Sequence, residues 1–156
     1  LKRLIRHSMT RAMIEPDTIR LLRECDAGIK MGTDSIDDVM PHVKNRRLKN
    51  LLNACKDEHK NLDKELQQML DGYGDEGKEP GFMAETMSKI KTGMKLQMDD
   101  TDNAVASLMT DGCNMGIKSL SKYLNQYAAA DEKSKDITKR LINIESRLVE
   151  DIRDFL

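Results

Sequence analysis

Hydrophobic residues recur every three or four positions along most of the chain, which is the period of an amphipathic helix. The rhythm is unbroken from about residue 44 to residue 73. Its members are Leu48, Leu52, Cys55, His59, Leu62, Leu66 and Met69. Similar stripes run through residues 18–39, 106–127 and 137–155, and no strand pattern is visible. The pattern therefore predicts an all-α protein with four long helices.

Proline and capping residues indicate where these helices begin and end. Pro16 and Asp17 are typical of a helix start, and Pro41 is expected to end the first helix. The third long helix is expected to begin near Asp99, and Asp131 is a typical N-cap for the fourth. Short turns therefore join the first helix to the second and the third to the fourth.

The connection in the middle of the chain is longer. Residues 72–81 read GYGDEGKEPG, and glycines and charges at this density predict a loop. Residues 82–98 then resume a shorter amphipathic pattern, which predicts a short extra helix that returns along the bundle. The expected fold is a four-helix bundle with one long crossover that contains this helix.

The chain is expected to consist of an N-terminal arm, residues 1–14, and a single four-helix-bundle domain, residues 15–156. The arm reads LKRLIRHSMTRAMI and is amphipathic and basic. A membrane-surface or partner-binding helix is one interpretation, but so few cations hold a membrane weakly. We expect the arm to pack on its own bundle or on a second subunit.

Composition narrows the classes of function. The formal net charge is −1 and aromatic residues make up 3% of the chain, so neither a basic field nor stacking platforms for nucleic acid are present. No run approaches the roughly 20 apolar residues that a membrane span needs. The three cysteines are widely spaced, which predicts reduced thiols and a cytoplasmic protein rather than a disulfide framework.

The segments IRLLRECDAGIKMG, LLNACKDEHKNLDKEL and LINIESRLVEDI, with the helix lengths around them, resemble the ferritin-like superfamily. More narrowly, residues 17–156 are similar to small bacterial ferritin-like domains of unknown function, in which a short helix fills the crossover. Di-iron members of the superfamily need a Glu-x-x-His motif on each of two helices. This sequence contains no such motif, and Lys56 stands three residues before His59. Ferroxidase or oxygenase chemistry is therefore not expected.

Four polar residues are expected near the mid-height of the bundle, because they lie at matching distances from the turns near residues 42 and 130. They are Cys25, His59, Cys113 and Glu145. Two thiols, an imidazole and a carboxylate are a possible ligand set for zinc, and thiolates also suit copper(I). Iron is the metal that the superfamily resemblance implies. Alternative ligands are Asp26, Cys55 and Asp111.

The same residues have a purely structural interpretation. Free cysteine is commonly a small buried hydrophobe, and a buried histidine is commonly satisfied by one carboxylate. A His59–Glu145 hydrogen bond would explain both polar residues without a metal. From the sequence we favour this structural interpretation and expect no cofactor, with zinc or iron at the mid-bundle residues as the alternative.

The first functional hypothesis is a non-enzymatic bundle that acts through protein association, as a homodimer or with another protein. The spacing of Gly28 with Gly32 and of Gly112 with Gly116 is typical of close helix packing. The alternatives are a metal-binding protein that uses the mid-bundle site and a carrier of a small apolar ligand. The carrier needs a cavity at the level of the glycines.

Overall fold

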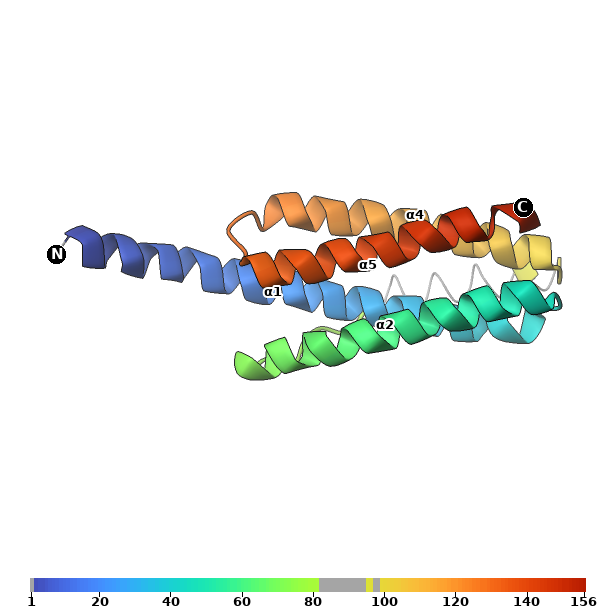
Figure 1. Ribbon diagram of the computed structural model, residues 1–156, viewed down its shortest axis with the longest axis horizontal. Helices are drawn as coiled ribbons and strands as arrows, with labels where there is room; N and C mark the ends of the chain where they lie inside the picture. The colour runs from blue at the N-terminus through green and yellow to red at the C-terminus, as the bar shows by residue number, and fades with distance from the viewer. Residues whose placement is uncertain (1, 82–94, 97–98) are drawn as a thin grey trace.

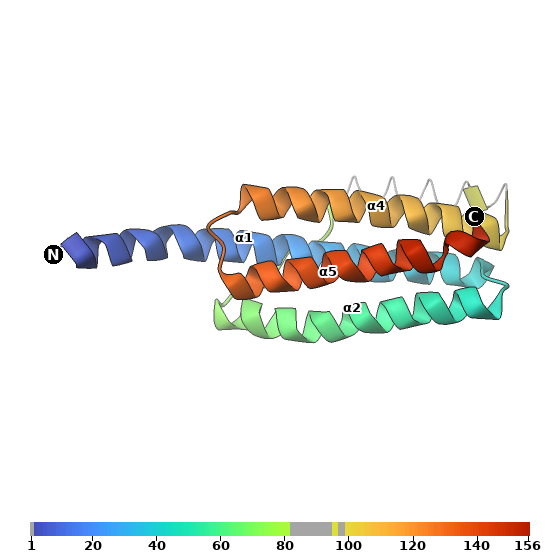
Figure 2. The ribbon, with the colours of Figure 1, turned by 45° about the horizontal axis from the view of Figure 1, so that its top comes forward.

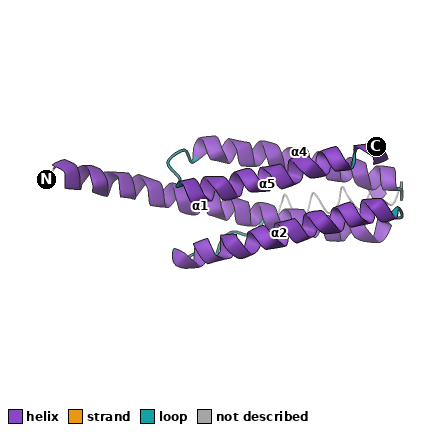
Figure 3. Ribbon diagram, in the orientation of Figure 1, coloured by secondary structure: helices purple, strands orange, loops and turns teal. Residues whose placement is uncertain are grey.

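The computed structural model describes residues 2–81, 95–96 and 99–156, and every regular element in that part of the chain is helical (Figure 3). Two 3₁₀ turns accompany four long helices. The elements are α1 (Lys2–Val39), η1 (Met40–His42), α2 (Arg46–Gly72), α4 (Asp102–Gln126), α5 (Glu132–Asp151) and η2 (Arg153–Phe155). The predicted all-α four-helix bundle is confirmed. The extra helix expected over residues 82–98 lies almost wholly outside the described residues.

The four helices lie side by side, with α1 and α5 running in one direction and α2 and α4 in the other (Figures 1 and 2). α1 packs against all three other long helices, and α5 also packs against α2 and α4. Because α2 ends at the opposite end of the bundle from the start of α4, the chain between Gly72 and Asp102 crosses the length of the bundle. The predicted position of the long connection is therefore confirmed.

The core is built from the predicted stripes. In α2, six of the seven stripe residues are buried, and Leu70 takes the buried place expected for Met69. The stripe of α5 is buried from Ile137 to Ile152. The α4 stripe becomes more exposed near its C-terminal end, where Tyr123 and Tyr127 are half-buried and stack with ring centroids 6.2 Å apart. Aliphatic side chains therefore fill most of the core.

α1 starts earlier than expected, because Pro16 lies inside the helix and not at its beginning. Proline has a helical φ, but it lacks the N–H that would bond one turn back and its ring crowds the carbonyl there, so the helix continues at the cost of both. The backbone shows no break between the arm and the bundle. The first turns of α1 project beyond the ends of the other helices, so the arm does not fold back on its own bundle (Figures 1 and 2).

Side-chain caps determine where the other helices start. The Asn45 side chain accepts from two backbone N–H groups of α2, and Asp131 caps α5 as predicted. α4 begins at Asp102, not near Asp99, because the Thr101 hydroxyl accepts from the backbone N–H of Ala104. The capping residues thus place each turn to within a few residues. Within the described residues, no helix has both the length and the apolar character that crossing a membrane requires.

Candidate functional site

His59 is the most enclosed ionisable side chain of α2, with 2% of its surface exposed. Its Nδ1 atom lies 2.8 Å from the carbonyl oxygen of Cys55. A carbonyl can only accept, so Nδ1 carries the proton and donates it. Burial lowers the pKa of His59, which keeps the ring neutral at pH 7. The second nitrogen, Nε2, is therefore left with a free lone pair, and it has no hydrogen-bond partner.

The ring of His59 faces Gly32 on α1. A Cβ atom at Gly32 would lie 2.8 Å from Nε2, closer than real Cβ contacts allow. Gly32 therefore makes room for the imidazole. It does not serve the backbone-to-backbone approach that the Gly28–Gly32 spacing predicted.

Glu145 on α5 has the same arrangement on the other side of the bundle. It is 7% exposed, and its Oε2 atom has no hydrogen-bond partner. A Cβ atom at Gly116 of α4 would lie 2.5 Å from that oxygen. Burial raises the pKa of Glu145 to about 8, so the carboxyl group is mostly protonated at neutral pH.

Gly32, His59, Gly116 and Glu145 share one level of the bundle. Gly28 faces Leu141 and Leu120, with its Cβ position 3.7 and 3.9 Å from their side chains. One turn further along the parallel helices α1 and α5 lie Gly32 and Glu145, and one turn back along the antiparallel α4 lies Gly116. Two glycines thus flank His59 and Glu145 in the same layer. The predicted His59–Glu145 hydrogen bond is not formed.

Cys55 and Cys113 are buried about one turn beyond this layer, towards the α1–α2 turn. The Cys55 sulfur lies 3.6 Å from Nδ1 of His59. The pKa of the Cys55 thiol is raised to about 12, first by burial and then by the nearby carboxylates Glu58 and Glu145. The pKa of Cys113 is also raised, first by burial and then by the charges of Glu145 and Cys55. Glu145 contributes to the raised pKa of Cys25 as well, so all three buried thiols lie within electrostatic reach of Glu145.

Cys25 is buried but lies apart from this group. Its sulfur is 3.1 Å from the hydroxyl of Thr138, which stands two helical turns, roughly 10 Å, before Glu145 on α5. The prediction that Cys25 shares the level of His59 is wrong. Its premise was a first turn centred near residue 42, whereas Met40–His42 is still helical and the chain reverses at Val43–Asn45. Because α1 and α2 run in opposite directions, moving the centre of the turn by one residue changes the α1 residue that faces a given α2 residue by two.

The two aspartates proposed as alternative ligands do not join the layer. Asp111 is exposed. Asp26 is fully buried, but its carboxylate already accepts from Lys30 Nζ, Gln67 Nε2 and the backbone N–H of Lys78, each at 2.9 Å. Asp26 therefore anchors the loop that follows α2.

Among the residues that the structure describes, no three His, Cys, Asp or Glu side chains are positioned to hold a metal ion as they stand. His59, Cys113 and Glu145 of the predicted set lie within about one turn of each other along the bundle, together with the alternative Cys55. Sequence reasoning missed the part played by Gly32 and Gly116. The signal that pointed to them was a glycine inside a helix stripe, which weakens the helix unless a neighbour needs the space.

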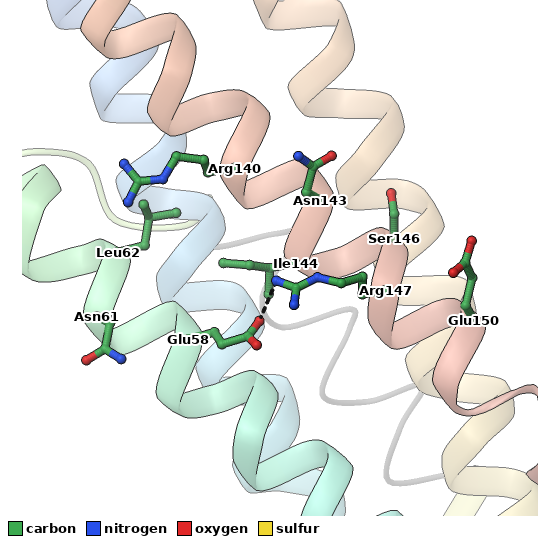
Figure 4. Close-up of a pocket in the computed structure, with 9 residues that line it drawn as sticks. All are labelled: Glu58, Asn61, Leu62, Arg140, Asn143, Ile144, Ser146, Arg147 and Glu150. Atoms are coloured by element: carbon green, nitrogen blue, oxygen red, sulfur yellow. Dashed lines mark hydrogen bonds and ion pairs between the residues drawn. The ribbon is translucent and has the colours of Figure 1, made fainter.

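A groove lies on the outer face between α2 and α5 (Figure 4). Leu62 and Ile144 contribute apolar surface, but polar and charged side chains make up most of the lining, and Arg147 pairs with Glu58 at 3.1 Å across it. The groove has a volume of about 640 Å³ and is open to solvent. Because it is open to solvent, this groove is not the enclosed cavity that the carrier hypothesis requires.

Comparison with curated proteins and with solved structures gave no significant match. The family comparison did give one, over residues 17–126. The matched range begins inside α1, next to Pro16, and ends at the last residue of α4, so it contains His59, both buried thiols of the mid-bundle group and the two glycines. The chain therefore belongs to the family described as Domain of unknown function (DUF2383).

Proposed function

We propose that this protein is a metal-binding helical bundle whose central ligand is Nε2 of His59. One observation carries the proposal: a nine-tenths buried imidazole presents an unpartnered lone pair at the centre of the bundle. Buried polar atoms are nearly always hydrogen-bonded, so one that is not is a candidate for a missing partner. Oε2 of Glu145 is a second such atom, on another helix at the same level.

The orientation of the imidazole supports a metal as that partner. Histidines that bind metals usually donate their other ring N–H to a carbonyl or carboxylate, which fixes the tautomer. Nδ1 of His59 does this with the carbonyl of Cys55. Gly32 and Gly116 lie against Nε2 and Oε2, and each glycine leaves the room that its polar neighbour occupies.

The order of the helices also supports this function. α1 and α5 run in one direction, α2 and α4 run in the other, and a crossover in the middle connects the two hairpins. This order resembles the ferritin-like superfamily, whose metals lie at mid-bundle. The absence of Glu-x-x-His argues against a di-iron centre. The proposed site therefore holds zinc or a single iron, and neither ferroxidase nor oxygenase activity is expected.

Elemental analysis tests this proposal. Protein purified without an affinity tag or chelator should contain close to one equivalent of zinc or iron, and His59→Leu should lose it. His42→Gln is the matched control, because His42 is partly exposed and pairs with Asp100 at the end of the bundle. Metal well below one equivalent in the folded parent, or equal loading in His59→Leu, would refute a site at His59.

We propose protein association as a second function, because the first turns of α1 project beyond the bundle (Figure 1). A helix that extends past its own core offers a surface on which a partner can pack. That partner is either another copy of the chain or a different protein. Sedimentation equilibrium of the full chain tests the homodimer. Ile5→Glu with Met9→Glu should dissociate it, whereas Ser8→Glu with Thr10→Glu, outside the apolar stripe, should not. A parent that sediments as a monomer excludes the homodimer.

A further inference from the structure

Building on the proposed protein association, we infer that a face formed by α4 and α5 binds a second copy of this chain about a two-fold axis near Met115. This contact is separate from the arm. The inference rests on an exposed methionine, on a bare glycine beside it, and on charges of opposite sign at the two ends of the face.

Met115 is an apolar side chain that lies in water. It is 70% exposed, more than any other large apolar side chain among the residues that the structure describes. Gly112 is also exposed one turn earlier on α4, and a Cβ atom there would meet nothing within 4 Å. α4 therefore carries a projecting side chain next to a bare stretch of backbone.

α5 extends this face. α4 and α5 run in opposite directions, and Gly116 lies against Glu145. Four residues further along α5, Val149 is therefore level with Gly112. Ile142 precedes Val149 by two turns on the same side of α5, and both side chains are only partly buried. The middle of the face is therefore apolar on both helices.

Charged side chains are separated along the length of this face. On α4, Asp111 precedes the exposed methionine by one turn, whereas Lys118 and Lys122 follow it. On α5, Glu150 is level with Asp111, and Lys139 is level with Lys122. Figure 4 shows Glu150 pointing away from α2. All five are exposed, and within the described part of the chain none of them forms an ion pair.

A two-fold axis perpendicular to α4 satisfies both features at once. The two copies of α4 then run antiparallel, and Met115 of each copy packs on the bare surface at Gly112 of the other. The acidic end of each copy faces the lysines of its partner. A two-fold contact of this kind uses the same surface twice and closes after two copies. The opposite charges determine its register.

The arms stay outside this contact. α1 runs antiparallel to α4, so the two-fold axis places the two arms at opposite ends of the pair (Figure 1). Each arm is therefore still free to bind a further partner.

Site-specific cross-linking tests the contact. Met115→Cys should form a covalent dimer when it is oxidised with copper–phenanthroline, because the two side chains lie close to the axis. The native cysteines are buried, so the parent should form none. Asn53→Cys, at an exposed position of α2, is the matched control and should not cross-link. No more covalent dimer from Met115→Cys than from Asn53→Cys would overturn the inference.

Charge reversal tests the pairing of the two ends. Asp111→Lys and Lys118→Asp should each weaken self-association at least about tenfold, because like charges then face each other. The double variant should regain association, because the exchanged charges pair again. Sedimentation equilibrium measures all three. A double variant as weak as the sum of the single changes would mean that these residues do not face each other.

Comparison with the arm variants separates this contact from the proposed association. If the parent self-associates but neither cross-links through Met115→Cys nor responds to charge reversal, this contact is wrong and association through the arm stands. If Asp111→Lys lowers the mass of the assembly and Ile5→Glu with Met9→Glu does not, the arm is excluded and this contact stands. A monomeric parent overturns both.

Discussion

At the scale of single residues, the main feature is that buried ionisable side chains lie against glycines. His59 lies against Gly32, Glu145 against Gly116, and Asp26 against Gly77, whose positive φ of 85° suits glycine. In each pair a methyl group would collide with a polar atom. The glycines are therefore part of how this core accommodates polar groups.

Gly32→Ala tests this directly. Alanine favours a helix over glycine by about 1 kcal/mol, but its Cβ would meet an imidazole that the Cys55 carbonyl holds in place. We expect a net loss of roughly 1–3 kcal/mol in the free energy of unfolding. Gly112→Ala is the control, because its Cβ meets nothing within 4 Å, and it should stabilise by about 1 kcal/mol.

Urea unfolding measures both variants. The double variant Gly32→Ala/His59→Ala should be more stable than His59→Ala alone, because the imidazole that clashes with the new methyl group is gone and only the helix preference of alanine remains. If Gly32→Ala stabilises the parent as much as Gly112→Ala does, the imidazole does not need the space.

Glu145 gives the metal-free protein a defined pH dependence. Its pKa is about 8 when folded and about 4.5 when exposed, so the folded state binds more protons between these values. The contribution of Glu145 to the free energy of unfolding is therefore fully present below about pH 4.5. It is lost as the pH rises towards 8, by up to about 1.4 kcal/mol per pH unit. His59 acts in the opposite sense: its pKa is lowered, so its stability is lost as the pH falls below about 6.5.

The window from pH 6.5 to 8 therefore isolates Glu145. Denaturant unfolding of the parent should show falling stability across it, and Glu145→Gln should remove most of that slope. Equal slopes in parent and variant would mean that Glu145 is ionised in the folded state.

At the scale of elements, α1 is the unusual helix, because it continues through Pro16 where the sequence predicted a start. Asn45, Thr101 and Asp131 cap the other long helices with their side chains. Those starts were predictable to within a few residues because a cap acts on its own next turn. A proline inside a helix is tolerated only when the helix on both sides is otherwise maintained.

Pro16→Ala tests whether α1 is one helix. Alanine restores an N–H that can bond one turn back, and it removes a penalty of up to about 3 kcal/mol for proline in a helix interior. Amide hydrogen exchange in residues 5–14 should slow. Unchanged or faster exchange there would indicate that the helix begins at Pro16.

At the scale of the whole molecule, the crossover is tied to α1 where it leaves α2. Asp26 accepts from Lys78 N–H, and Arg23 makes two hydrogen bonds of 3.1 Å and a shorter one to Asp75. Lys30 pairs with both Asp26 and Glu79. These contacts hold residues 75–79 against α1 and so direct the start of the crossover.

Asp26→Ala should be strongly destabilising. It removes the fully buried carboxylate that three donors share, and breaking a buried charged network typically costs about 3–5 kcal/mol. The amide of Lys78 should also exchange faster. Asp38→Ala, at an exposed position of α1, is the control and should change stability by less than about 0.5 kcal/mol. Losses of similar size in both variants would mean that Asp26 does not anchor the loop.

Hydrophobic periodicity by itself determined the four helices, their buried faces and the long connection, because burial of an apolar stripe is a local, repeating requirement. It also placed His59 and Glu145 in the core. Only the tertiary structure decided which residues share a level. The chain reverses at Val43–Asn45, so Cys25 meets Thr138, and Gly32 takes the place opposite His59. Register depends on the exact turn and on packing between helices, which no single segment of sequence contains.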